Sequence, residues 1–157
     1  MNIKLKVLEG KQYNNLNFVP YMQTNSEVND YLNSIDIDLG GLSGAEGWNL
    51  PSFNATALGK WSVVINATAH KDWATKDNSI LIEPSSLKDC YDDVFFKKGQ
   101  SFNQGQFFDI SDQEIDNAIL KSLPYAKTPN LEGLKLQKQF TYEKTVETIL
   151  CAISSQM

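Results

Sequence analysis

The pattern of apolar and polar residues predicts a series of short strands separated by helices. Apolar residues alternate with lysines over residues 3–8, which is the period of a half-buried strand. Residues 61–65 form an apolar run rich in β-branched side chains, as expected of a strand buried on both faces. Shorter apolar runs predict further strands over residues 16–19, 35–39 and 79–82.

Helix signals lie between and after these strands. Ser26 is expected to cap a helix that ends before residue 35, with Val28, Tyr31 and Leu32 on one face. Pro51 stands where the first turn of a helix tolerates proline. That helix is expected to end at Gly59, and a short helix is predicted around residues 71–75.

Two later helices carry cap sequences at their starts. Ser111 and Glu114 have the spacing of a capping box. Thr141 is expected to cap the last helix. The predicted apolar face of that helix carries Val146, Ile149 and Leu150. Residues 85–105 show no regular pattern, and we expect them to form an irregular, aromatic-rich loop packed by its own side chains.

The alternation of strands and helices indicates an α/β fold. We expect a Rossmann-like three-layer sandwich with a mostly parallel sheet. The length of 157 residues falls in the range of one domain, so residues 1–157 are predicted to fold as a single unit. Residues 3–8 and 16–19 are too close for a helical crossover, so these two strands form an antiparallel hairpin or are joined irregularly.

Composition and charge exclude several kinds of partner. A formal net charge of −5 argues against duplex nucleic acid, because proteins that bind it need clustered cations. All 14 basic residues are lysines, so no guanidinium fork is present for phosphate, although an AT-rich coding sequence would also explain this. Cys90 and Cys151 are too few and too far apart in sequence for a zinc site. We therefore expect no metal.

Targeting signals are also missing from the sequence. The first ten residues lack the apolar core of a signal peptide. No apolar run approaches the roughly 20 residues that cross a bilayer. We therefore expect a cytoplasmic protein without a membrane span.

A glycine-bearing loop connects the predicted strand 35–39 to the helix that starts near Pro51. In open α/β sheets, ligands bind beyond the carboxyl ends of the strands, and free N–H groups at a helix start attract phosphate. The arrangement predicts a site for an anionic, phosphate-bearing ligand. An ordinary tight turn is the alternative.

The same segment resembles a known family signature. Residues 46–51 read Glu-Gly-Trp-Asn-Leu-Pro, and residues 54–60 read Asn-Ala-Thr-Ala-Leu-Gly-Lys. They are similar to the signature of retaining, nucleotide-sugar-dependent glycosyltransferases of the GT-B fold. Ala-His-Lys-Asp-Trp at 69–73 and Phe-Thr-Tyr-Glu-Lys at 140–144 resemble later motifs of that family, in the same order. The resemblance implies the C-terminal, donor-binding half of a GT-B fold.

The resemblance implies a role for each matching residue. Glu46 would be the catalytic residue that approaches the transferred sugar. Backbone N–H groups near Asn49 and Leu50 would hold the diphosphate, and Asn54 would meet the ribose. Val19 and Pro20 would frame the nucleobase, whereas His70 is either a loop residue near the sugar or phosphates or a satisfied core residue. The donor-binding residues are thus expected to be Val19, Pro20, Gly47, Asn49, Leu50, Asn54 and His70.

Packing is the alternative for the apolar side chains of this segment. Trp48, Leu50 and Phe53 are expected to serve the core with their side chains rather than to touch a ligand.

Three departures from the family pattern limit what the resemblance implies. Asn54 replaces the family's second glutamate with a neutral amide that can still bond a hydroxyl. The Gly-Arg and lysine that clamp the diphosphate have no counterpart. We also expect the N-terminal acceptor domain to be absent and the strand over residues 3–8 to take the central place in the sheet.

Two functions therefore follow. The first is binding of a UDP- or GDP-hexose for retaining hexosyl transfer, with no other cofactor. It would be completed by an acceptor domain, either on another polypeptide or in a longer protein of which this chain is a piece. The second is a non-catalytic nucleotide-sugar-binding or interaction module derived from the same fold. An unrelated Rossmann-like domain for another phosphorylated ligand is a third, weaker interpretation. A domain face exposed by the missing half would favour a homodimer.

Overall fold

The computed structural model describes residues 13–91, 96–101 and 105–155. The chain divides into two compact units, residues 1–31 and 32–157. The predicted strand over residues 3–8 lies outside the described residues. The elements are α2 (Asn25–Ser34), β1 (Ile37–Gly41), α3 (Leu50–Ala57), β2 (Trp61–Ile65), η1 (Thr68–Asp72), β3 (Ser79–Ile82), β4 (Ser86–Asp89), β5 (Gln106–Asp109), α4 (Asp112–Ser122), η2 (Leu123–Tyr125), α5 (Leu131–Leu134), α6 (Leu136–Gln139) and α7 (Tyr142–Ser154).

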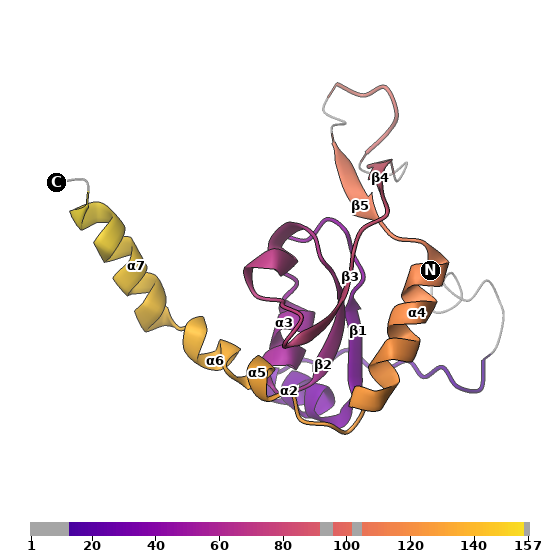
Figure 1. The fold of residues 1–157 in the computed structure, drawn as a ribbon, viewed down its shortest axis with the longest axis horizontal. Helices are drawn as coiled ribbons and strands as arrows, with labels where there is room; N and C mark the ends of the chain where they lie inside the picture. The colour runs from indigo at the N-terminus through magenta and orange to yellow at the C-terminus, as the bar shows by residue number, and fades with distance from the viewer. Residues whose placement is uncertain (1–12, 92–95, 102–104, 156–157) are drawn as a thin grey trace. The chain divides into compact units, whose positions relative to one another are not determined.

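The described part of the second unit is built on a parallel sheet in the order β1-β2-β3. Ile37 pairs with Trp61, and Val64 pairs with Leu81. Helix α3 packs on β1 and β2, while α4 packs on β2 and β3. Figure 1 shows these two helices on opposite sides of the sheet. The second unit is therefore an α/β structure with helices on both faces, which is compatible with a Rossmann-like fold.

Strand β2 supplies the core of both faces. Val63 and Val64 are fully buried and point in opposite directions, as successive strand residues do. Val64 packs with Trp73 and Leu136, and Val63 packs with Ile80 and with Ala118 of α4. Burial of each such side chain stabilises the fold by roughly 1.5–3 kcal/mol. The double burial explains why this strand is apolar without alternation.

Helix α3 ends in a Schellman motif. The N–H of Gly59 donates to the carbonyl oxygen of Thr56 at 2.9 Å, and that of Lys60 donates to Ala55 at 3.0 Å. Gly59 has a φ of 84°, in the left-handed region that a side chain disfavours. The predicted end of this helix at Gly59 is therefore confirmed.

Asn130 joins the ends of several elements and is fully buried. Its Nδ2 donates to the carbonyl oxygen of Lys60 at 2.9 Å and to that of Asn78 at 2.7 Å. Its Oδ1 accepts from the N–H of Gly133 at 2.8 Å and caps α5. One side chain therefore fixes α5 to the chain segments that enter β2 and β3.

The two cap sequences at later helices are confirmed. Ser111 and Glu114 form a reciprocal capping box at the start of α4, and the side chain of Thr141 caps α7. The predicted apolar face of α7 exists, but Val146, Ile149 and Leu150 are each more than half exposed. Within the described ranges, no helix is both long and apolar enough to cross a membrane.

Two predictions at the start of the chain are wrong. Residues 16–19 form no strand, and Leu16, Phe18 and Val19 are 44–52% exposed. A short apolar run needs a paired neighbour to become a strand, and two strands alone are only marginally stable. Helix α2 begins at Asn25 rather than after Ser26, because Thr24 and Glu27 bond each other's N–H groups.

Other predicted boundaries also change. Strand β1 covers residues 37–41 instead of 35–39, and the short helix is a 3-10 helix at 68–72 instead of 71–75. The predicted irregular loop 85–105 begins with β4, which pairs antiparallel with β5. All four β4 residues are exposed. Backbone pairing without side-chain burial leaves no hydrophobic alternation in the sequence.

Candidate functional site

Two loops meet at the carboxyl edge of the parallel sheet. The loop after β1 carries residues 42–49, and the loop after β2 leads into η1. The N–H of Ala69 donates to the carbonyl oxygen of Glu46 at 3.4 Å, and the N–H of Glu46 donates to Oγ1 of Thr68 at 3.4 Å. This edge is where open α/β sheets bind their ligands.

Asn49 joins the start of α3 to both loops. Its backbone is left-handed, with φ 60° and ψ 66°, a conformation that asparagine tolerates. Its Oδ1 accepts from the N–H of Ser52 at 3.3 Å and caps α3. Its Nδ2 donates to the carbonyl oxygen of Gly40 at 2.9 Å and lies 3.1 Å from Nε2 of His70. The side chain therefore holds α3, β1 and the second loop in one arrangement.

His70 is fully buried behind Asn49. Its Nδ1 lies 3.0 Å from the carbonyl oxygen of Ile65, which can only accept, so Nδ1 carries the proton and Nε2 accepts from the Asn49 amide. Burial lowers the pKa of His70 below its usual 6.5, against smaller raising effects of the Ile65 bond and the Glu46 charge. His70 is thus a neutral, fully bonded side chain. Its predicted contact with a sugar or phosphate would require the ring to be uncovered and stays a prediction.

Two non-glycine residues at this edge have a positive φ. Thr68 has a φ of 50°, and Asn49 has a φ of 60°. A β-branched residue in the left-handed region is a true outlier and costs of order 1–3 kcal/mol. Such strain persists where the surroundings fix it, and it gathers at functional sites. Thr68 was missed from the sequence, because its role comes from a backbone conformation and from a bond to Glu46, 22 residues away.

A cluster of aromatic side chains packs together at the loop that follows β1. Nε1 of Trp73 donates to the carbonyl oxygen of Trp48 at 3.0 Å. The rings of Trp48, Phe53 and Phe140 meet at centroid distances of 5.1–5.5 Å. Core packing therefore accounts for Trp48 and Phe53, as expected. Leu50 differs, because it is 61% exposed.

The glycines at the end of β1 and in the loop after it occupy either closely packed or open positions. A Cβ on Gly41 would lie 2.0 Å from a methyl carbon of Val64, and one on Gly44 would lie 1.7 Å from the carbonyl oxygen of Phe108. Close packing thus explains these two glycines. A Cβ on Gly47 would meet nothing within 4 Å in the described structure. The space beside the backbone at Gly47 is therefore open.

The first turn of α3 has few free N–H groups. Pro51 has none, that of Ser52 is bonded to Asn49 Oδ1, and that of Phe53 donates to the Asn49 carbonyl oxygen at 3.0 Å. In the described part of the chain, the backbone N–H groups of Asn49 and Leu50 donate to no acceptor. These are the two groups that the sequence predicts to face phosphate. An anion at this helix start would have to bind there.

A buried carboxylate lies on the sheet side of the same helix turn. Asp38 Oδ1 accepts from the N–H of Gly40 at 3.1 Å. Its Oδ2 and the Oγ of Ser52 are buried without a hydrogen-bond partner among the described residues. A Cβ on Gly40 would lie 2.8 Å from that Oγ, so the backbone of β1 packs closely against α3 at this point.

The remaining predicted site residues differ in accessibility. Glu46 is half-buried, whereas Gly47 and Asn54 are exposed. Val19 and Pro20 are exposed residues of the first unit, and their predicted contact with a nucleobase stays a prediction. Across the described ranges, His, Cys, Asp and Glu side chains form no group of three or more that could hold a metal ion.

No protein-family model matches the sequence, and no curated protein matches it. Function must therefore be inferred from the site itself.

Proposed function

We propose that the chain binds a nucleotide-activated hexose at the loop after β1 and at the start of α3. In this proposal it is the donor-binding half of a retaining GT-B glycosyltransferase, completed by an acceptor domain. The donor is a UDP- or GDP-hexose. The ordered sequence resemblance and the geometry of residues 46–54 support the proposal.

The observation that carries the proposal is the contrast between a fixed loop and its open face. Asn49, His70 and Trp73 hold the loop by buried and partly buried hydrogen bonds. On the outer side, Gly47 leaves open space and Leu50 is exposed. A fixed backbone with free N–H groups binds an anion without first having to be ordered.

Each residue of the open face has a distinct chemical task in this proposal. The N–H groups of Asn49 and Leu50 stabilise the diphosphate as it departs, aided by the positive end of α3. The half-buried carboxylate of Glu46 accepts hydrogen bonds from the hydroxyls of the hexose. Asn54 lies one helical turn after Leu50 and therefore on the same face of α3, where its amide can bond a ribose hydroxyl.

Isothermal titration calorimetry with UDP, GDP and their hexose conjugates tests the proposal. We expect saturable binding of one nucleotide, weakened at least tenfold by Gly47→Val, whose side chain fills the open space. Asp116→Asn, on the exposed face of α4, is the matched control and should bind as the wild type does. Absence of binding by every nucleotide at millimolar concentration would reject the proposal for this chain.

Donor hydrolysis separates the enzymatic function from the non-catalytic module. Water would displace the nucleoside diphosphate from the anomeric carbon, giving free hexose and the diphosphate. A slow hydrolysis that Glu46→Gln abolishes, while nucleotide binding remains, favours the glycosyltransferase. Binding without hydrolysis in the wild type favours the non-catalytic module.

A further inference from the structure

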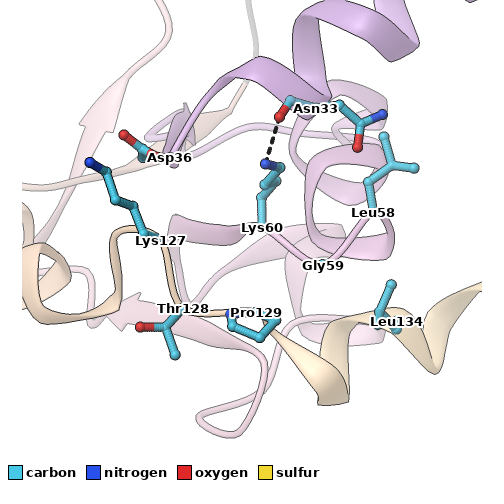
Figure 2. A pocket seen from close by; sticks show the side chains of 9 residues that line it. All are labelled: Asn33, Asp36, Leu58, Gly59, Lys60, Lys127, Thr128, Pro129 and Leu134. Carbon is cyan, nitrogen blue, oxygen red and sulfur yellow. Dashed lines mark hydrogen bonds between the residues drawn. The ribbon is translucent and has the colours of Figure 1, made fainter.

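A cavity lies at the opposite edge of the sheet, where β1 and β2 begin. Its volume is about 270 Å³, and all of its lining belongs to the second unit. Figure 2 shows this amino-edge cavity from close by. Its lining includes Asp36, Leu58, Lys60, Lys127, Pro129 and Leu134. The size is just below the usual range of 300–1,000 Å³ for ligand pockets, which suits a ligand smaller than a nucleotide sugar.

Lys127 occupies a backbone position that favours glycine. The N–H of Thr128 donates to the carbonyl oxygen of Tyr125 at 2.9 Å, closing a β-turn. Ala126 has φ −54° and ψ 130°, and Lys127 has φ 66°, which are the angles of a type II turn. Glycine or asparagine is the usual residue at this third position. The backbone conformation therefore disfavours a lysine at this position. A function of the lysine side chain would explain why the position carries one.

The walls of the cavity are fixed to one another. The N–H of Asn130 donates to the carbonyl oxygen of Gly59 at 2.9 Å, and its buried side chain bonds the carbonyl oxygens of Lys60 and Asn78. The strained turn at Lys127 is thus tied to the end of α3. A cavity with fixed walls loses little conformational freedom when a ligand binds.

The charges of the lining differ from those of the whole protein. Two lysines and one aspartate give the lining a net charge of +1, in a chain whose net charge is −5. Nζ of Lys60 donates to the carbonyl oxygen of Asn33 at 2.7 Å, which orients the ammonium and leaves further N–H donors. Two ammonium groups suit a dianionic phosphate better than a singly charged carboxylate.

We propose that the amino-edge cavity binds a small phosphate ester, with its phosphoryl group held by the ammonium groups of Lys60 and Lys127. The carbon skeleton of the ester lies against Leu58 and Pro129. A hydroxyl of the ligand donates to the carboxylate of Asp36. This site is separate from the proposed donor site, which lies beyond the carboxyl ends of the same strands.

Titration calorimetry with glucose 6-phosphate, inorganic phosphate and gluconate tests the proposal. We expect glucose 6-phosphate to bind saturably and more tightly than the other two. Lys60→Met and Lys127→Gly should each weaken binding tenfold or more, whereas Lys138→Met on the exposed side of α6 should not. Gly47→Val should also leave this binding unchanged, which separates it from the donor site.

Thermal melting of the same variants tests the strain at Lys127. Lys127→Gly should raise the melting temperature by about 2–4 °C, because glycine relieves the left-handed backbone. Lys127→Asn, which also tolerates that conformation, should lose binding without loss of stability. The proposal is overturned if the wild type binds no phosphate ester, if gluconate binds as tightly as glucose 6-phosphate, or if Lys127→Gly binds normally. A lower melting temperature of Lys127→Gly would overturn the strain argument.

Discussion

Replacement of Asn49 by alanine should destabilise the whole carboxyl-edge site. The change removes the cap of α3, which costs about 1 kcal/mol. It also leaves Nε2 of the buried His70 without a donor, which costs about 1–3 kcal/mol. Together the free energy of unfolding should fall by about 3 kcal/mol, or about 6–12 °C in melting temperature for a chain of this length.

Urea denaturation followed by circular dichroism measures this loss. Asn54→Ala is the matched control, because Asn54 lies exposed in the same helix, and its change should stay within about 0.5 kcal/mol. Asn49→Asp keeps the cap oxygen but places an acceptor opposite the Gly40 carbonyl oxygen and Nε2 of His70, so at pH 7 it should also be clearly less stable than the wild type. The reasoning is refuted if Asn49→Ala is as stable as Asn54→Ala.

Three further predictions follow from buried or strained positions. Burial lowers the pKa of His70, so the unfolded chain binds more protons below about pH 6.5. The free energy of unfolding should therefore fall as the pH drops from 6.5 to 5, by at most about 1.4 kcal/mol per pH unit. Thermal melts at several pH values should show that His70→Gln removes this dependence. Asn130→Asp turns two donors into an acceptor that faces carbonyl oxygens. Denaturant titration should show that the free energy of unfolding falls by at least about 2 kcal/mol. An unchanged midpoint would contradict the role of this residue. Gly59→Ala should lower the free energy of unfolding by about 1–2 kcal/mol in the same titration, because residue 59 has a φ of 84°. An unchanged stability would argue against the Schellman end of α3.

Elements with strong local signals could be predicted from the sequence. The strands over 61–65 and 79–82 have the predicted bounds, because their apolar runs are buried in the core of the sheet. The end of α3 and the starts of α4 and α7 were also predictable, since caps are set by neighbouring residues. Strand β1 was displaced because its final two glycines resemble a loop. Gly41 in fact ends the strand, where contact with Val64 leaves no room for a side chain.

The candidate site could be predicted only in part, because several of its contacts join distant residues. The loop and helix start at residues 46–50 have the expected form. The bond between Asn49 and His70 joins positions 21 residues apart, and the left-handed backbone of Thr68 has no sequence signature. Asn130 was missed for the same reason, since its partner Asn78 is 52 residues away. The exposed strand β4 left no apolar pattern.

A titration of the isotope-labelled chain with UDP-glucose and GDP-mannose, followed by amide NMR spectra, tests the donor site most directly. The account predicts saturable shifts of the Gly47, Asn49 and Leu50 amides with one of the two donors, and no comparable shift of Lys127. An absence of saturable shifts at residues 46–54 with both donors, or shifts confined to the amino-edge cavity, would contradict the proposed donor site.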